Sequence, residues 1–335
     1  MIDIFKAKEL IDTNNVNNKN NRILSTEGPV PFVQIQGFLE LPGVVHGFST
    51  RLGGVSEGIY ESLNLGLRLD DDREKVLKNY ELFGQSVGFD PKRISCPDQV
   101  HKDNILVVSE EDAGDGVARE LSHFEIDAQI TNCKNIPLIV YWADCVPILL
   151  YDPVSRVIGS VHAGWRGSVA GIAFKAVKKM VDEFGCLPDN IHAVIGPSIG
   201  PDNYEVSEEV MQAVYACPYL DLSDDNINIT EVKPNDQAVS AFSGSYIRDD
   251  MPENYLGIRQ PGRGALYPLY RTVSFRKRYM LNLWNLNELI LINAGLSMGN
   301  IYNTRLCTMQ YHDIFFSHRY TNGRRGLNAG IIMLK

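Results

Sequence analysis

Residues 136–151 are the stretch of sequence that most constrains how this chain can fold. Its two halves, residues 136–141 and 146–151, are apolar and rich in β-branched side chains, a pattern typical of strands buried in a sheet. Asp144 and Cys145 stand between them. Burying a carboxylate is costly unless another group pairs with it. The stretch therefore predicts two core strands whose connection holds a functional site.

Strand-like and helix-like segments alternate along the rest of the chain. Strands are expected over residues 43–48, 126–131, 156–162, 191–195, 300–306 and 314–317, and helices over residues 72–83, 168–184 and 283–294. A glycine comes after each expected helix, at Gly84, Gly185 and Gly295, and is expected to end it. This order predicts the α/β (α+β) class, as a single compact domain with a mixed sheet packed by helices.

The N-terminal part differs in composition from the rest of the chain. Residues 12–22 are rich in asparagine and lysine, which is typical of an exposed linker. We therefore expect residues 1–30 to form an N-terminal extension or linker, and residues 31–335 to form one catalytic domain.

Charge and cysteine usage exclude several classes of protein. The formal net charge is -9 and no basic patch stands out, which argues against a nucleic-acid binder. The start of the chain has no basic region followed by an apolar stretch, so no signal peptide is expected. The longest apolar run is too short to span a bilayer and is interrupted by Asp144. The 6 cysteines are scattered without a CxxC pair, so we expect a cytoplasmic protein without a disulfide framework.

Two histidines and one cysteine form a candidate metal site. His101 begins a polar loop, His162 stands at the end of an expected strand, and Cys145 lies beside another strand end. Zinc accepts nitrogen and sulfur ligands, and three protein ligands leave a position open for a water molecule that the metal activates. The spacing alone also allows a plainer interpretation, in which Cys145 is a small buried residue and the histidines only satisfy hydrogen bonds.

Three further segments carry polar groups that could contact a ligand. The loop over residues 49–56 combines glycines, hydroxyls and Arg51, and can hold an anion. The turn over residues 164–167 can also hold an anion, because it stands at the expected start of a helix. Asp127 and Gln129 alternate along an expected strand. Ordinary turns and a half-exposed strand would explain these segments equally well.

Taken together, these residues resemble a known family, the laccase-domain proteins, also called polyphenol oxidase or peptidoglycan-editing-factor proteins. The matching segments are residues 46–56 (HGFSTRLGGVS), 62–66 (SLNLG), 99–101 (QVH), 127–128 (DA), 143–148 (ADCVPI), 162–167 (HAGWRG), 195–200 (IGPSIG), 204–206 (YEV), 307–308 (CT) and 315–319 (FFSHR). They occur in the family's order and cover roughly residues 40 to 335, and their combination is highly specific.

The resemblance implies a zinc enzyme of purine nucleosides, with His101, Cys145 and His162 as ligands in a surface cleft. The implied reactions are phosphorolysis of adenosine, inosine and S-methyl-5'-thioadenosine to base and sugar phosphate, and deamination of adenosine, with purine nucleosides and phosphate as partners. We expect catalytic roles for Cys145, Arg51 and Asp127. Residues expected to contact substrate are Ser49, Arg51, Asn64, Gly164 and Arg166.

The sequence departs from the family's pattern at several positions. Asp202 and Asn203 replace a frequent cysteine pair, Lys102 comes after the histidine ligand, and Asn282 replaces an aspartate. Residues 250–275 match no pattern of the family. None of these positions is an expected metal ligand, so they leave the preferred nucleoside open. Whether the chain is a monomer or a dimer is also open.

Three other functions are consistent with the same ligands. Copper, bound when supplied, would suggest oxidation of phenols, but no His-X-His pair occurs and 7 histidines are too few for an additional copper cluster. Hydrolysis of an amide in a cell-wall precursor is a second alternative. A structural zinc in a binding module is a third, although such a site normally has a fourth protein ligand.

Overall fold

The computed structural model describes residues 2–13, 18–220, 270–274 and 278–335. A five-stranded antiparallel sheet has the order β1-β2-β3-β14-β6, so the C-terminal strand lies inside the sheet. Its strands are β1 (Arg22–Ser25), β2 (Phe32–Ile35), β3 (Val44–Ser49), β14 (Asn328–Leu334) and β6 (Leu138–Trp142).

A six-stranded sheet has the order β13-β9-β7-β8-β5-β4. Its strands are β13 (Ile301–Asn303), β9 (His192–Ile195), β7 (Val146–Asp152), β8 (Val157–Ala163), β5 (Ala128–Thr131) and β4 (Ile105–Val107). The two outer pairs, β13-β9 and β4-β5, are parallel and the others are antiparallel. The predicted mixed sheet is confirmed, although it is one of three sheets; the third joins β10 (Glu205–Val206), β12 (Arg278–Leu281) and β11 (Tyr270–Ser274).

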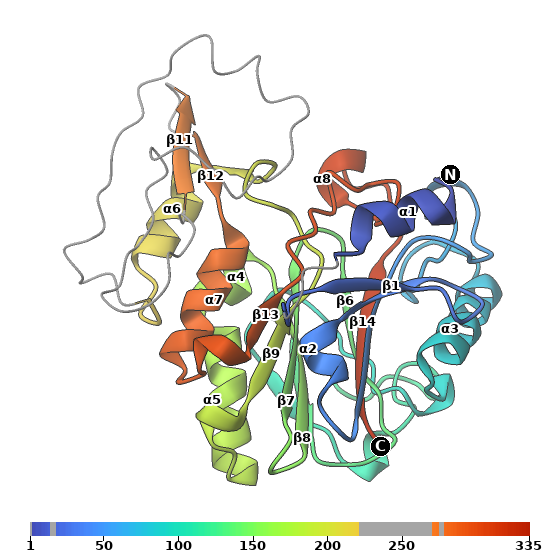
Figure 1. Ribbon diagram of the computed structural model, residues 1–335, viewed down its shortest axis with the longest axis horizontal. Coiled ribbons are helices and arrows are strands. Elements are labelled where there is room, and N and C mark those ends of the chain that lie inside the picture. Colours follow the sequence, from blue (N-terminus) through green and yellow to red (C-terminus); the bar gives the residue numbers. More distant parts are fainter. Residues whose placement is uncertain (1, 14–17, 221–269, 275–277) are drawn as a thin grey trace.

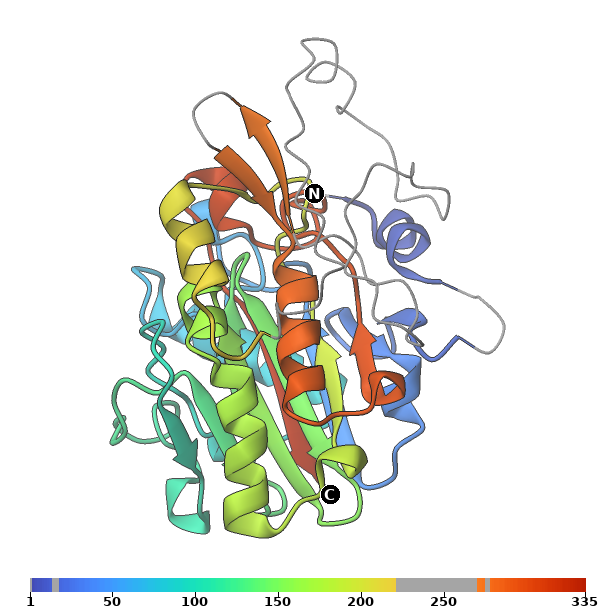
Figure 2. The same ribbon diagram turned by 90° about the vertical axis from the view of Figure 1, so that its left-hand side faces the viewer.

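The two large sheets pack face to face and helices cover both outer faces (Figure 1). Between the sheets lie fully buried side chains from both, among them Phe48, Trp142, Leu149 and Ile332. Helices α5 (Ile172–Phe184) and α7 (Leu283–Asn293) lie side by side over the six-stranded sheet (Figure 2), and α3 (Arg73–Val87) covers the five-stranded sheet. These four layers confirm the predicted α/β class, because each sheet buries both faces.

Most of the predicted strands and helices form within two residues of their expected bounds. The two strands on either side of Asp144 and Cys145 are β6 and β7, and they are buried along their whole length, as their apolar composition predicts. The expected strand over residues 314–317 is wrong, because the backbone N–H groups of Ile314 and Phe315 donate to the carbonyl of Tyr311 in a turn.

Two glycines act differently from the prediction. Gly84 lies inside α3, and the helix ends at Gly88, whose backbone is left-handed with φ 93°. Gly84 is needed for packing, because a Cβ there would lie 2.7 Å from the carbonyl oxygen of Phe89. The predicted helix over residues 168–184 is divided into α4 (Trp165–Val169) and α5 by Gly171, which is left-handed and against which the ring of Tyr219 packs.

The first 30 residues contribute α1 (Ile4–Ile11) and the edge strand β1. Ala7, Ile11 and Leu24 are fully buried, so both elements pack against the core between the sheets. The division of the chain at residue 31 stays a prediction. Residues 14–17, and residues 250–269 and 275 of the segment that matches no family pattern, lie outside the described residues.

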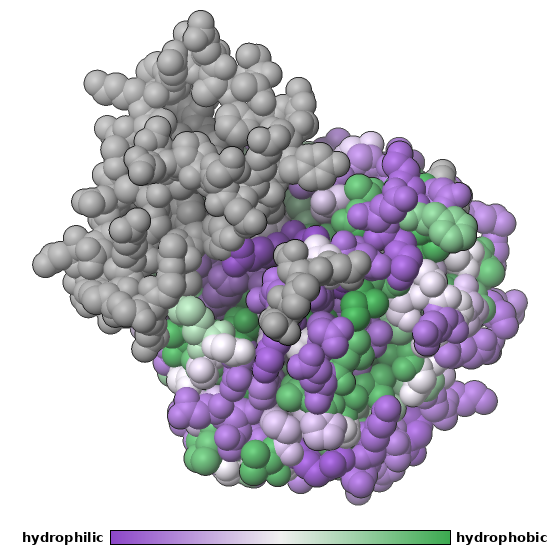
Figure 3. Space-filling view, viewed as in Figure 1, coloured by the Kyte–Doolittle hydropathy of each residue, from purple (hydrophilic) through white to green (hydrophobic). Residues whose placement is uncertain are grey.

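Short elements complete the described chain. They are helices α2 (Gln36–Leu39), α6 (Glu208–Tyr215) and α8 (His318–Thr321), and five one-turn 3₁₀ helices. Among the described residues, no helix is both long enough and apolar enough to cross a membrane. On the face shown in Figure 3, hydrophilic and hydrophobic residues are intermingled over the described surface. All 6 cysteines are free thiols, in agreement with the prediction that there is no disulfide framework.

The fold predicts a loss of stability in acid that depends on His46. This side chain is buried on β3, where its Nε2 accepts a hydrogen bond from the backbone N–H of Ile35 at 3.1 Å. Burial lowers the pKa of His46 to about 3. The unfolded chain takes up a proton below its ordinary pKa, whereas the folded chain does not. The contribution of neutral His46 to the stability of the fold is therefore complete above the ordinary pKa of histidine. It is lost as the pH falls from there towards about 3.

We expect His46 to cost about 2–3 kcal/mol between pH 6.5 and 4.5, at 1.36 kcal/mol for each pH unit. In His46→Gln, an amide oxygen can accept the Ile35 bond without titrating, so the free energy of unfolding should fall less steeply. Urea unfolding at several pH values measures both slopes. Equal slopes in the two proteins would contradict the prediction.

Candidate metal centre and its cavity

The structure brings together His101, Cys145 and His162, the three predicted metal ligands. Their ligand atoms all lie within 4.8 Å of one another, and Cys145 Sγ is 3.7 Å from His101 Nε2. A tetrahedral zinc ion would place a sulfur and a nitrogen ligand roughly 3.6 Å apart, given bond lengths of about 2.3 and 2.05 Å. Two imidazoles and one thiol in this geometry fit a zinc ion and leave one position open.

The backbone explains how residues so distant in sequence meet. In the antiparallel pair of β7 and β8, Val146 lies opposite Ala163 and Pro147 opposite His162, so Cys145 and His162 share one end of the sheet. His101 is in the left-handed region, with φ 63°. A Cβ at Gly164 would lie 3.0 Å from both Cys145 Sγ and the His101 ring, so any larger residue there would push against two of the candidate ligands.

Asp127 holds two of the three ligands in place. Its Oδ1 accepts hydrogen bonds from His162 Nδ1 at 2.8 Å and from the backbone N–H of His101 at 3.0 Å. Its Oδ2 accepts from the backbone N–H groups of Val100 and Lys102 at 3.1 and 2.8 Å. The bond to Nδ1 leaves Nε2 of His162 free to bind a metal ion. Asp127 is buried outside the cavity, so it orients the ligands and is not placed to act on a substrate.

The charges at the centre favour a thiolate. Burial raises the pKa of Cys145, but the charge of His162 and the hydrogen bond with His101 outweigh it and lower that pKa to about 6. Burial lowers the pKa of His162, but Cys145 and Asp127 outweigh it and raise that pKa to about 9. A metal ion bound here would be held by a Cys145 side chain that favours the thiolate, and by His162 in its neutral form.

Asp144 has the partners that its buried position requires. Its Oδ1 accepts a hydrogen bond from Thr308 Oγ1 at 2.5 Å, and its Oδ2 accepts one from the backbone N–H of Arg319 at 2.6 Å. The residue itself is left-handed, with φ 87°. Asp144 thus fixes the turn before Cys145 and ties it to the C-terminal part of the chain.

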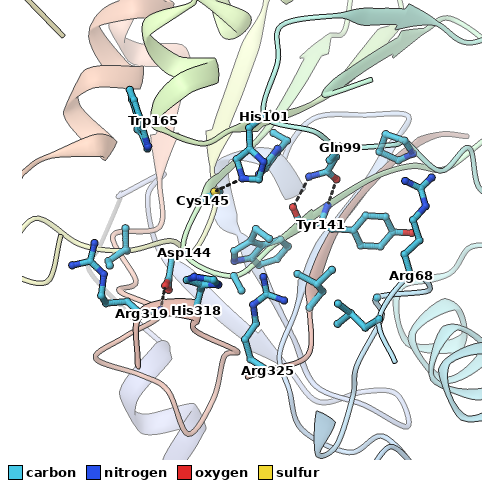
Figure 4. Close-up of a pocket in the computed structure, with 18 of the residues that line it drawn as sticks. Arg68, Gln99, His101, Tyr141, Asp144, Cys145, Trp165, His318, Arg319 and Arg325 are labelled. Carbon is cyan, nitrogen blue, oxygen red and sulfur yellow. Dashed lines mark hydrogen bonds between the residues drawn. The ribbon is translucent and has the colours of Figure 1, made fainter. Parts of the chain in front are cut away.

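Gln99 joins the loop of His101 to the five-stranded sheet. Its side chain donates to the carbonyl of Tyr141 at 2.8 Å and accepts from the N–H of Tyr141 at 2.7 Å, as Figure 4 shows. The Gln99 side chain therefore satisfies a backbone N–H and a carbonyl of β6, as a neighbouring strand would do. Gln99 lies in one of the family's motifs, but no role could be assigned to it from the sequence.

The three candidate ligands line a cavity of about 500 Å³. Four arginines also line it: Arg68, Arg166, Arg319 and Arg325. Asp144 is the only carboxylate among the described lining residues, and both its oxygens already accept hydrogen bonds. The rest of the wall is largely apolar or aromatic and includes Trp142, Trp165 and Tyr204. Arg68 is ion-paired with Asp98, whereas Arg166, Arg319 and Arg325 have no carboxylate partner among the described residues. The cavity therefore combines a candidate metal site with positive charge from these three arginines.

The expected substrate residues lie in different places. Arg166 lines the cavity and Gly164 packs against the ligands, but Ser49, Arg51 and Asn64 are not among the lining residues. Arg51 donates to the carbonyls of Glu61 and His312 and lies over the ring of Phe316 at 4.7 Å. Its guanidinium is thus occupied by structural contacts.

The loop over residues 49–56 has a structural explanation in the fold. Ser49 Oγ accepts from the N–H of Ala329, and Asn64 Oδ1 accepts from the N–H groups of Gly66 and Leu327. Asn79 on α3 bonds Val55, Ser56, Ser62 and Asn64 at once. A Cβ at Gly54 would overlap the Ser62 carbonyl, so this glycine serves close packing.

Arg68, Arg325, Tyr204 and His318 were not assigned to the site from the sequence, and neither was Arg319. Tyr204, His318 and Arg319 lie in the family's motifs, which was the only signal. Single arginines in polar loops otherwise give no indication that they converge on one cavity.

Comparison with known proteins shows the family to which the chain belongs. Residues 45–233 and 259–335 match the family described as multi-copper polyphenol oxidoreductase laccase. The purine nucleoside phosphorylase YlmD of Bacillus subtilis is 34% identical over 295 residues, covering 87% of this chain and 89% of that protein. The adenosine deaminase RL5 of an unidentified prokaryote is 28% identical over 288 residues, covering 85% and 91%.

A solved structure shows the same fold. The crystal structure of YfiH from Bacillus licheniformis superimposes with a TM-score of 0.75 at 29% identity, covering 93% of this chain and 99% of that one. The sequence match, the shared fold and the converging motif residues lead to one conclusion: the chain belongs to the multi-copper polyphenol oxidoreductase laccase family.

Proposed function

We propose that this chain is a cytoplasmic, zinc-dependent enzyme of purine nucleosides. Its reactions are phosphorolysis of adenosine, inosine and S-methyl-5'-thioadenosine to base and sugar phosphate, and deamination of adenosine. The observation that carries the proposal is that His101, Cys145 and His162 line the same cavity as four arginines. The names of the two relatives above, a purine nucleoside phosphorylase and an adenosine deaminase, support it.

The cavity suits both substrates of a phosphorolysis. Arginine donors bind phosphate oxygens in pairs, and Arg325 is available for this, because its buried Nε has no hydrogen-bond partner in the described part of the chain. Trp165, over which Arg166 lies at 4.2 Å, offers a flat apolar surface for a purine ring. The volume lies within the range of small-molecule sites, roughly 300–1,000 Å³.

The residues present fit a zinc ion, which is the metal that we propose. His101, Cys145 and His162 would hold it, and Asp127 keeps His162 oriented with Nε2 towards the other two ligands. When bound, zinc would supply Lewis acidity at the cavity wall. The arginines would bind and orient the phosphate, and the apolar wall would exclude water from the reacting carbon.

Phenol oxidation is the second candidate, because the family's description names copper. The donor set of two histidines and one cysteine also occurs in copper sites. Among the described residues, however, this is the one group of three or more histidine, cysteine or acidic side chains placed to hold a metal. A single ion supports zinc chemistry better than a multi-copper cluster.

Metal content tests the centre directly. We expect purified protein to contain about one zinc per chain. Cys145→Ser should lose most of it, because a hydroxyl is a poor zinc ligand. Asp127→Asn should weaken zinc binding by roughly 10- to 100-fold, because its amide nitrogen cannot accept hydrogen bonds from the loop of His101. Cys133→Ser, outside the centre, is the matched control. Elemental analysis gives the answer, and full zinc retention by Cys145→Ser would remove this thiol from the ligand set.

Nucleoside turnover tests the reaction. Adenosine, inosine and methylthioadenosine are supplied with and without phosphate, and bases and sugar phosphates are separated by chromatography. We expect base release only with phosphate, and inosine from adenosine without it. Turnover of phenols only after copper loading, with no base released, would favour the oxidase. Neither base release nor deamination in zinc-replete protein would reject the nucleoside proposal and leave amide hydrolysis as the first alternative.

The phosphate site can be located with conservative arginine variants. Arg325→Lys loses a paired donor in the cavity, so we expect the KM for phosphate to rise by roughly 10-fold or more, the equivalent of one charged hydrogen bond of about 1.5–3 kcal/mol. Arg119→Lys, on the surface, serves as control. Arg51→Lys tests the expectation from the sequence. If Arg51→Lys alone raises this KM, the phosphate lies at residues 49–56 and not among the cavity arginines.

A further inference from the structure

The cavity contains a histidine that the metal centre does not use. His318 is the first residue of α8, after Ser317, which caps the helix by accepting from the N–H of Tyr320. It lines the same cavity as His101 and Cys145. Within the described part of the chain its imidazole makes no hydrogen bond. Both ring nitrogens are therefore available to a ligand.

The other titratable groups that line the cavity are already engaged. Both oxygens of Asp144 accept hydrogen bonds. Cys96 and Tyr141 are hydrogen-bonded to each other at 3.0 Å, and burial raises the pKa of the Cys96 thiol to about 11. His101, Cys145 and His162 also line the cavity, but they are the candidate metal ligands. Among the titratable residues that the structure describes in the cavity wall, this leaves His318 and the phenol of Tyr204 besides the arginines.

Burial and the charges around His318 favour its neutral form. Burial and the nearby Arg325, Arg319 and His101 lower its pKa below the ordinary value, and Asp144 only partly offsets them. Figure 4 shows His318 between Arg319 and Arg325, beside Asp144. A neutral imidazole has one nitrogen that accepts a proton and one that donates it. Burial raises the pKa of the Tyr204 phenol far above neutrality, so that group can donate a hydrogen bond but cannot exchange its proton readily.

We infer that His318 is a catalytic residue, which carries the proton released by phosphate to the departing purine. The inference rests on the proposed phosphorolysis. In that reaction an oxygen of hydrogen phosphate bonds to C1′ of the sugar. The bond from C1′ to the purine nitrogen breaks, and its electron pair stays with the purine. Hydrogen phosphate must lose its proton, and the purine must gain one.

His318 balances this exchange without any other reactant. Its free ring nitrogen takes the proton from the phosphate hydroxyl, and its other nitrogen gives a proton to a purine ring nitrogen. The products are the neutral purine and the sugar phosphate dianion, and His318 is again neutral in its other tautomer. The cationic side chains that keep His318 neutral are also those that attract the phosphate.

The experiment compares zinc-replete parent protein with His318→Gln, His318→Ala and Tyr204→Phe, using adenosine and inorganic phosphate. His123→Ala is the matched control, because His123 pairs with Asp112 and does not line the cavity. We expect both His318 variants to lose on the order of 10²-fold in kcat. Zinc content and the KM for phosphate should stay within a few-fold of the parent. Added imidazole should restore part of the rate in His318→Ala.

A pH profile separates proton transfer from a structural role. The parent's kcat should fall as the pH drops through the lowered pKa of His318, because a protonated ring cannot accept a proton. This acidic limb should be absent in His318→Gln.

Several results would overturn the inference. It is wrong if an active parent keeps its rate in His318→Gln, if the loss of rate tracks zinc loss, or if Tyr204→Phe alone is inactive. A parent that releases no base would reject the proposed function itself, and the inference with it.

Discussion

The buried carboxylate of Asp127 is the interaction on which the candidate site depends. Its side chain is fully buried and accepts four hydrogen bonds, three from consecutive backbone N–H groups and one from His162. A carboxylate without such donors could not stay charged there. Because the same two oxygens hold the loop of His101 and the ring of His162, the distance between two candidate ligands is set by the protein before any metal binds.

The third ligand is placed by the way the two large sheets are joined. Strand β6 belongs to the five-stranded sheet and β7 to the six-stranded sheet, and Asp144 and Cys145 lie where the chain passes from one to the other. Asp144 bonds Thr308 and Arg319, and Gln99 bonds β6, so several loops meet at this crossover. The candidate site therefore lies where strand ends from both sheets converge.

The sequence was sufficient for the parts of the structure that depend on apolar patterning. The strands on either side of Cys145 and the packing of helices on a mixed sheet result from which side chains avoid water. Gly84 was expected to end a helix but lies inside α3, and Gly171 divides a helix that was expected to be continuous. The local sequence is the same for a glycine that ends a helix and for one that allows close packing. The roles expected for Ser49, Arg51 and Asn64 met the same ambiguity, since a loop built for packing also contains glycines, hydroxyls and an arginine. Arg68 and Arg325 lie far from the ligands in sequence, and only the tertiary fold brings them to one cavity.

The positive charge in the cavity affects both the binding of an anion and the protonation of His318. Arg68 is ion-paired with Asp98, but the other three lining arginines have no carboxylate partner among the described residues, so an anion is favoured there over a neutral phenol. Burial and the same field disfavour an additional proton on His318, which leaves one of its nitrogens free to accept. A phosphate that enters the cavity brings both negative charge and a proton to be removed. The arrangement that attracts the nucleophile thus also supplies the group that can take its proton, which links phosphate binding and proton transfer in one set of side chains.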